Sequence, residues 1–150
     1  MQNDEIIKTI KDFFEKLNIS IIDVKEIVSG DIVVYNVLTN DSRSAIGKNG
    51  EHLDALHHLL SLMFAKNGDK DFHFNLDVNG HKQTKMNELM FEVHDVAKEV
   101  IKFKKDIALR PMTSYERLIV HNMFSGSIQI ETKSEGEAKD RHIVLSYMHI

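Results

Sequence analysis

The sequence predicts an α+β protein made of two small modules. Stretches with apolar residues at helical spacing alternate with short β-rich runs along the whole chain. The 150 residues, 42% of them hydrophobic, are enough for one domain or for two small ones. No flexible linker marks a boundary, so we place it near Gly80–Thr84, where a long helix predicted at 84–103 begins. The predicted modules are therefore 1–80 and 81–150, with the long helix bridging them.

The first module is predicted to run helix, strand, strand, helix, glycine loop, helix, strand. Its two β-rich runs flank the turn signal Ser29-Gly30-Asp31, which predicts an antiparallel hairpin, with a bulge near Ile22-Asp23 where the alternation is imperfect. The helix after the glycine loop is expected to bury one apolar face, formed by Leu53, Leu56, Leu60, Met63 and Phe64. The predicted elements are helix 4–17, strands 19–28 and 32–38, a short helix ending at Ile46, helix 51–66 and strand 72–78.

The second module is predicted to combine two helices with three short strands. Thr113 and Glu116 have the spacing of a capping box, which predicts a helix that starts at Ser114. Within that helix, the run 118–120 is expected to pack inward. The predicted elements are helix 84–103, a short strand at 106–110, helix 114–124, strand 127–132, a polar loop at 134–140 and strand 141–147.

Composition excludes several classes of protein. The chain has no cysteine, which rules out disulfides, thiolate zinc sites and cysteine nucleophiles. Its apolar runs are too short to cross a bilayer, and its first residues are acidic where a signal peptide is basic, so we expect a soluble cytoplasmic protein. The net charge is −4, and residues 1–41 carry four lysines against eight acids. The remainder is near neutral, which disfavours strong non-specific binding of nucleic acid but permits a local basic surface.

The chain is organised around the glycine loop Gly47-Lys48-Asn49-Gly50. Two glycines let the backbone bend sharply and let another backbone approach closely. The following helix directs free N–H groups and its positive dipole end at the loop, and Lys48 adds a mobile charge, so this geometry suits phosphate. Gly-x-x-Gly before a helix matches the loop by which a KH domain clamps a nucleic-acid backbone. The alternative for this short pattern, taken alone, is a plain helix–helix turn.

A second candidate site combines Arg117 and His121, which are four residues apart and share one face of the predicted helix 114–124. Arginine supplies a two-pronged donor and histidine a donor with an optional charge, so the pair suits one phosphate. Arg141 extends this patch if the last strand lies beside the helix. The alternatives are a packing role for His121, an acidic partner for Arg117, and a cross-strand pair of Arg141 with Glu131.

An enzyme is not expected. A cluster able to ligate a metal is formed by His57-His58 with Asp54 and Glu51. Both histidines, however, are expected at the edge of the buried face or in solvent. The chain has no His-Glu-x-x-His, Gly-x-Ser-x-Gly or P-loop motif. We therefore expect no catalysis, no metal and no cofactor.

Four blocks of the sequence form a pattern that extends beyond the glycine loop. The blocks are Asp41-Ser42 leading into IGKNGEHLDAL (46–56), LDVNGH (76–81), RPMTSYERLIVH (110–121), and SEGE (134–137) before Arg141. A single block would be weak evidence, but four blocks spread from Asp41 to Arg141 form a specific match. In this order they resemble the bacterial Jag family, the SpoIIIJ-associated proteins also known as EloR or KhpB. These proteins join a KH domain to a module named R-3-H for its Arg-x-x-x-His signature, which is here Arg117 and His121.

The resemblance implies a KH domain with the αββααβ, type II-like arrangement, followed by a small α/β R-3-H domain. It implies binding of single-stranded RNA, or the matching DNA, through backbone N–H groups of the glycine loop. The implied side-chain contacts are Lys48, Asn49, Arg43 beside the loop, and the patch of Arg117, His121 and Arg141. It also implies a regulator linked to cell elongation and envelope synthesis, and pairing with a small stand-alone KH protein.

Two departures from the family pattern affect these expectations. Family members usually carry a further N-terminal domain and a linker, whereas the first helix is predicted to start near Met1, so recruitment through that domain is not expected. His142 stands where family members often have a second arginine, which makes the patch more dependent on pH.

A protein-interaction adaptor is the competing hypothesis. KH surfaces also serve as dimer faces, and the net negative charge favours an adaptor over a promiscuous RNA binder. A steep loss of RNA affinity with salt would support RNA binding. A complex with a second KH protein that persists without RNA would support the adaptor.

Overall fold

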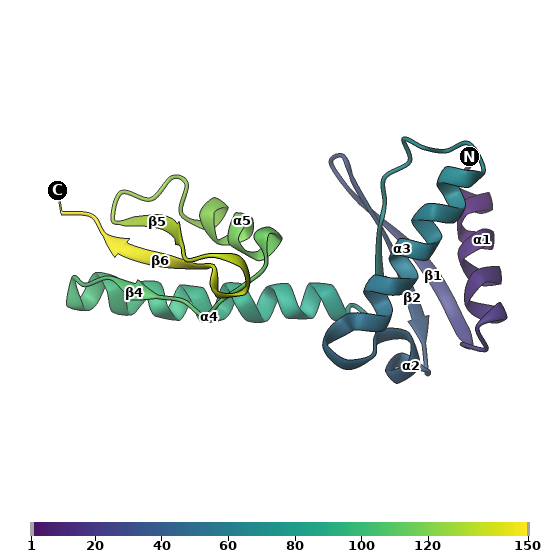
Figure 1. The fold of residues 1–150 in the computed structure, drawn as a ribbon, viewed down its shortest axis with the longest axis horizontal. Helices are drawn as coiled ribbons and strands as arrows, with labels where there is room; N and C mark the ends of the chain where they lie inside the picture. Colours follow the sequence, from purple (N-terminus) through teal and green to yellow (C-terminus); the bar gives the residue numbers. More distant parts are fainter. Residues whose placement is uncertain (1, 150) are drawn as a thin grey trace. The chain divides into compact units, whose positions relative to one another are not determined.

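The computed structural model describes residues 2–149 and divides into two compact units, Met1–Thr84 and Lys85–Ile150 (Figure 1). Each unit combines helices with one three-stranded sheet, so the predicted α+β class is confirmed. Helix α4 (His81–Phe103) begins in the first unit and supplies most of its turns to the second. None of the helices in residues 2–149 is long and apolar enough to cross a membrane.

The first unit follows the order of elements that the sequence predicts. Strands β1 and β2 form an antiparallel hairpin whose register shifts between Ile21 and Asp23, which confirms the predicted bulge. Strand β3 joins β2 in parallel, giving the sheet order β1-β2-β3. The elements are α1 (Asn3–Lys16), β1 (Ile21–Ser29), β2 (Ile32–Thr39), α2 (Ser42–Ile46), the short 3-10 turn η1 (Lys48–Gly50), α3 (Glu51–Lys66) and β3 (Asn75–Val78).

Helices α1 and α3 cover one face of this sheet (Figure 1). Alternate residues of a strand point to the same side, so Tyr35 and Val37 of β2 lie on the same face as their neighbours Leu76 and Val78 in β3. Ala45 of α2 is fully buried in the same core, which fixes the start of the glycine loop. The helices contribute Ile6, Ile10, Phe14, Leu53, Leu56, Leu60 and Phe64.

Two predictions for the first unit need correction. The sequence places Met63 on the buried face of α3, but it is exposed, because it lies at the edge of the stripe that the other four residues form. The predicted strand 72–78 is shorter, since the ladder with β2 begins only at Asn75. Phe72 and Phe74 instead stack on each other at a centroid distance of 5.4 Å and close the core.

The second unit places α4 and α5 against an antiparallel sheet of order β4-β6-β5. The buried stripe of α4, namely Leu89, Val93, Ala97 and Val100, recurs at helical spacing. It packs in one core with Val120 of α5 and with apolar residues of the sheet. The elements after α4 are β4 (Ile107–Ala108), α5 (Ser114–Met123), β5 (Ile130–Glu135), the 3-10 turn η2 (Ala138–Asp140) and β6 (His142–Tyr147).

Two predictions for the second unit are also wrong in detail. The strand predicted at 127–132 begins at Ile130, because the Ser127 hydroxyl accepts the N–H groups of Gln129 and Ile130 and holds a turn there. The same strand continues through Glu135, where it still pairs with β6. Leu118 is exposed, whereas Val120 alone of the predicted inward run 118–120 is fully buried.

Candidate nucleic-acid interface

The glycine loop contains a sharp turn at Gly47. Its N–H ends α2 by donating to the carbonyl oxygen of Arg43 at 3.0 Å. Its φ of 71° with ψ of −176° is a conformation that side chains disfavour. A Cβ at this position would also lie 2.5 Å from the ring of His52, whose Nδ1 is 2.9 Å from the Ser44 carbonyl oxygen. Position 47 therefore requires glycine for two independent reasons.

Lys48 and Asn49 form the exposed tip of the loop. Asn49 and Gly50 are both left-handed, with φ of 55° and 77°, and α3 starts directly after them. The N–H groups of Gly50 and Glu51 are bonded inside the turn, to the carbonyls of Gly47 and Lys48. Within the described chain, the amides of Lys48 and Asn49 are left as the open donors of this loop.

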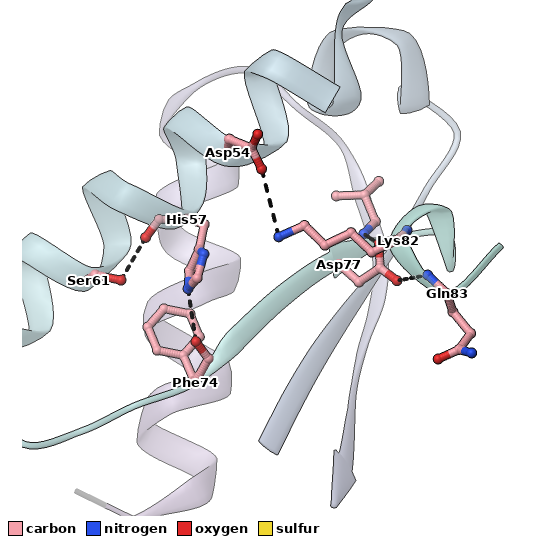
Figure 2. A network of polar contacts seen from close by, with 8 residues as sticks. Asp54, His57, Ser61, Phe74, Asp77, Lys82 and Gln83 are labelled. Carbon is pink, nitrogen blue, oxygen red and sulfur yellow. Dashed lines mark hydrogen bonds and ion pairs between the residues drawn. The ribbon is translucent and has the colours of Figure 1, made fainter. Parts of the chain in front are cut away.

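The first turn of α4 lies on the other side of the loop. Asp77, which is almost fully buried, accepts the N–H groups of Lys82 at 2.9 Å and Gln83 at 3.4 Å (Figure 2). These bonds satisfy the free donors of a helix start and explain why α4 begins at His81, three residues earlier than predicted. The turn brings His81 near Gly50, where an added Cβ would be 3.7 Å from the His81 Nε2.

His52 and His81 thus flank the glycine loop, and sequence reasoning assigns neither of them a role. Their only signal is that both lie inside the blocks that resemble the Jag family. Arg43 is exposed on the short helix just before the loop, as expected for a residue that flanks a binding groove. The loop therefore gathers backbone donors, two cations and two imidazoles on one edge of the first unit.

His57 holds α3 to the segment before β3. Its Nε2 is 2.8 Å from the carbonyl oxygen of Phe74, so Nε2 carries the proton, since a carbonyl only accepts (Figure 2). Burial lowers the pKa of His57, and the hydrogen bond to Phe74 opposes part of that shift. Asp54 pairs with the Lys82 ammonium at 3.9 Å. Among residues 2–149, no three metal-ligating side chains come together.

The capping box predicted at Thr113 and Glu116 is confirmed and starts α5. The Thr113 hydroxyl accepts the Glu116 N–H at 3.2 Å, and the Glu116 carboxylate accepts the Thr113 N–H at 2.9 Å. One turn later, Arg117 reaches back toward the helix start. It donates to the Met112 carbonyl at 2.8 Å and to the Ser114 hydroxyl at 3.0 Å. Two of its five N–H donors are thereby used, and its guanidinium is held in place.

Arg117 and Arg141 line one open pocket of about 680 Å³. Arg141 directly precedes β6 and donates to the Gly136 carbonyl at 2.8 Å. Gly136 has φ of 84°, and a Cβ there would lie 2.9 Å from the Asp140 backbone oxygen, so this tight loop needs glycine. Lys139, which sequence reasoning missed, lines the same pocket. Three cations, together with Glu116, therefore line the pocket where the α5 start meets the loop between β5 and β6.

His121 shares the helix with Arg117 but is held by other partners. Its Nδ1 is 2.6 Å from the Thr132 hydroxyl and its Nε2 is 2.9 Å from the Ser134 hydroxyl, both on β5. It therefore ties α5 to β5 and is not among the residues that line the pocket. The alternative pairing of Arg141 with Glu131 is wrong, because Glu131 lies opposite Ser146.

His142 takes no part in lining this pocket. Its Nδ1 is 2.8 Å from the Asp140 carbonyl oxygen. The structure thus brings Arg117, Arg141 and Lys139 together and leaves His121 and His142 as residues that hold the surrounding backbone.

Comparison with known proteins gives one family match and two relatives for this chain. Residues 88–147 match the family model of the R-3-H domain, a range that includes the whole pocket. The RNA-binding protein KhpB of Clostridium symbiosum is 28% identical over 144 residues, which are 95% of this chain and 65% of that protein. The RNA-binding protein KhpB of Bacillus subtilis (strain 168) is 33% identical over 117 residues, which are 77% of this chain and 56% of that protein.

The chain spans less than two thirds of the length of either relative. The similarity nevertheless runs through both units, since it covers 95% of this chain in one alignment. The Arg-x-x-x-His signature that names the matched domain is present as Arg117 and His121. The chain therefore contains an R-3-H domain in its second unit and is a homologue of the KhpB proteins of the Jag family.

Proposed function

We propose that this chain binds single-stranded RNA, with the first unit acting as a KH domain of type II-like arrangement. The element order of the first unit, with a glycine loop between α2 and α3, supports a KH assignment. The relatives carry the name RNA-binding protein KhpB. The observation that carries the proposal is the pair of open amides at Lys48 and Asn49, beside the Lys48 ammonium and at the start of a helix.

In this proposal the loop grips the phosphate backbone with main-chain donors. The N–H groups of Gly47 and Gly50 already donate within the protein. The proposed phosphate contact therefore uses the N–H groups of Lys48 and Asn49. Lys48 and Arg43 add positive charge, and about four nucleotides lie along the groove beside the loop, the usual span of a KH clamp. His121 acts by positioning β5 instead of touching phosphate.

The second contact is the pocket of Arg117, Arg141 and Lys139. Arginine offers paired donors to a phosphate, and the remaining N–H groups of Arg117 and Arg141 are suited to this. Because both contacts belong to one chain, binding at one raises the effective concentration of RNA at the other. A weak pair of sites thereby gives useful affinity despite the net charge of −4.

The resemblance to the Jag family extends the proposal to a role in the cell. We place the protein in the cytoplasm, as a post-transcriptional regulator linked to cell elongation and envelope synthesis. Binding, without catalysis and without a cofactor, is the proposed activity, and single-stranded DNA is a further candidate ligand for the same phosphate contacts.

The test is fluorescence anisotropy with short labelled single-stranded RNA and the matching DNA, at low and moderate salt. The variant K48D/N49D should abolish binding without unfolding the first unit, because both side chains are exposed. The matched control is K66D/N67D, which makes the same charge change at the exposed far end of α3. Unchanged RNA binding by K48D/N49D would refute the clamp. Equal losses of affinity in both variants would show that the added negative charge, and not its place in the loop, weakens binding.

A protein-interaction adaptor remains a second candidate, and one observation favours it. Leu59, Leu62 and Met63 are exposed at helical spacing on α3, an apolar face with no cover in the described part of the first unit. We propose a small stand-alone KH protein as its partner. A complex that survives ribonuclease in size-exclusion chromatography, and that L59S/L62S abolishes, would support this function. A complex that disappears on ribonuclease treatment would count against it.

A further inference from the structure

The end of α4 carries an exposed aromatic ring with two lysines over it. Phe103 is 58% exposed, although it closes a helix whose other face is buried in the core of the second unit. The Lys102 ammonium lies 5.4 Å from the centroid of the ring, and the Lys105 ammonium lies 5.6 Å from it. Lys104 between them is left-handed, with φ of 52°, and turns the chain back so that Lys105 lies close to the ring.

This corner is locally basic in an acidic protein. Residues 98–106 contain four lysines and two acids, whereas the whole chain is at −4. In the described part of the chain, neither Lys102 nor Lys105 pairs with a carboxylate. The ring and the two ammonium groups are therefore each other's main partners, through contacts that are weak at an exposed site. Such contacts exchange easily for stronger ones with a ligand.

We propose that Phe103 is a stacking platform for a nucleobase of single-stranded RNA, and that Lys102 and Lys105 bind the flanking phosphates. In the complex, a base stacks on the ring face and phosphates pair with the two ammonium groups. These contacts replace both cation–π contacts, so the ring and the ammonium groups each keep a partner. Stacking tolerates any base, because every base has a π-face. This site rests on the proposed RNA binding and adds to it a contact that does not depend on the glycine loop.

The platform is separate from the pocket of Arg117, Arg141 and Lys139. The segment that follows Lys105 runs along β6, since Ile107 pairs with Leu145 and the Met112 N–H bonds to the Arg141 carbonyl. The platform and the pocket therefore lie at opposite ends of β6. The six residues of that strand measure about 20 Å. One strand of RNA running along this edge would touch both.

A membrane surface is the other ligand that lysines and an exposed phenylalanine suggest. Binding at a bilayer interface needs a broad apolar face to insert. Phe103 offers a single ring, and the next exposed aromatic of α4, Phe91, is twelve residues away and on another side of the helix. The observations thus favour RNA, and vesicles serve as the contrasting probe.

The direct test places a fluorescent reporter at the platform. The chain has no tryptophan, so F103W introduces a single one, and stacking on a base quenches its emission. The probe is single-stranded RNA of mixed sequence and about twelve nucleotides, within the range that such proteins cover. We expect emission to fall on addition of RNA in F103W and to stay constant in F91W, the matched control on the same helix.

Affinity measurements complete the test. F103L keeps the apolar volume but removes the stacking face, and it should weaken RNA binding about fivefold or more, while F91L leaves it unchanged. Equal affinities of F103L, F91L and wild type would overturn the platform, as would an emission change of F103W with anionic phosphatidylglycerol vesicles and not with RNA. If wild type binds RNA, these results concern the platform alone. Failure of wild type to bind any RNA would refute the proposed function together with the platform.

Discussion

The glycine loop of the first unit and the pocket of the second unit both suit phosphate, but they offer different kinds of donor. The loop presents main-chain N–H groups, and its shape depends on the backbone angles of Gly47, Asn49 and Gly50. The pocket presents the side chains of Arg117 and Arg141, which are held by ordinary hydrogen bonds to neighbouring carbonyls and a hydroxyl.

This difference predicts how each contact responds to change. A main-chain N–H donor stays in place when a side chain is shortened. The loop should therefore lose phosphate binding only when its backbone geometry changes, and it should then lose all of it. A side-chain cation can be neutralised without moving the backbone, so the pocket should lose affinity in steps, one phosphate at a time.

The largest effect is expected for G47A. The added Cβ meets the His52 ring at 2.5 Å and the residue keeps an unfavourable φ, so we expect loss of RNA binding and a stability cost of about 1–3 kcal/mol. The control is G30A, where φ is 61° but nothing lies within 4 Å of the added Cβ. It introduces a side chain at a positive φ without a close Cβ contact, and it should retain RNA binding. Urea unfolding and anisotropy measure both quantities, and equal behaviour of G47A and G30A would contradict the role of His52.

The pocket should give a graded response in R117Q and R141Q. Each substitution removes one cation, so the slope of log affinity against log salt should become shallower by about 0.7 for each phosphate that the protein no longer neutralises. The double variant should show both steps. R110Q is the control, since Arg110 is exposed, pairs with Glu92 at 3.5 Å and lies outside the pocket. A slope that stays unchanged in the double variant would remove the pocket from the RNA interface.

Local patterns predicted the elements well, and the particular failures have physical causes. The capping box at Thr113 and the bulge near Asp23 follow from short-range chemistry, which the sequence displays directly. The early start of α4 depends on Asp77, a residue of another element whose carboxylate meets the helix only after folding. The same holds for the pocket. The sequence motif identifies Arg117, but Lys139 reaches the pocket only because the chain turns at Gly136 in the folded protein.

A smaller effect is expected for H121A, which tests whether His121 contacts phosphate or only positions β5. H121A leaves the hydroxyls of Thr132 and Ser134 without the ring between them, so we expect a stability loss of about 1–2 kcal/mol in the second unit. RNA affinity, measured well below the unfolding midpoint, should change little. H142A is the comparison, since His142 bonds to one exposed carbonyl and should cost less. A large loss of affinity in H121A at unchanged stability would instead make His121 a direct contact.

The smallest effect is expected at His57, which ties α3 to the segment before β3. Burial lowers the pKa of His57 below 6.5, so the unfolded chain takes up this proton at a higher pH than the folded chain. The contribution of His57 is therefore fully present above about pH 6.5 and is lost as the pH falls toward the folded pKa.

Acidification should thus weaken the first unit through His57. Urea unfolding from about pH 7.5 to about pH 5 measures this loss. H57Q should reduce it, because the Gln amide nitrogen takes the place of Nε2 and still donates to the Phe74 carbonyl but does not titrate in this range. H58Q makes the same substitution at the exposed neighbour and is the control, which should lose stability as the wild type does. If H57Q and wild type lose stability in parallel, groups other than His57 cause the acid sensitivity of the first unit.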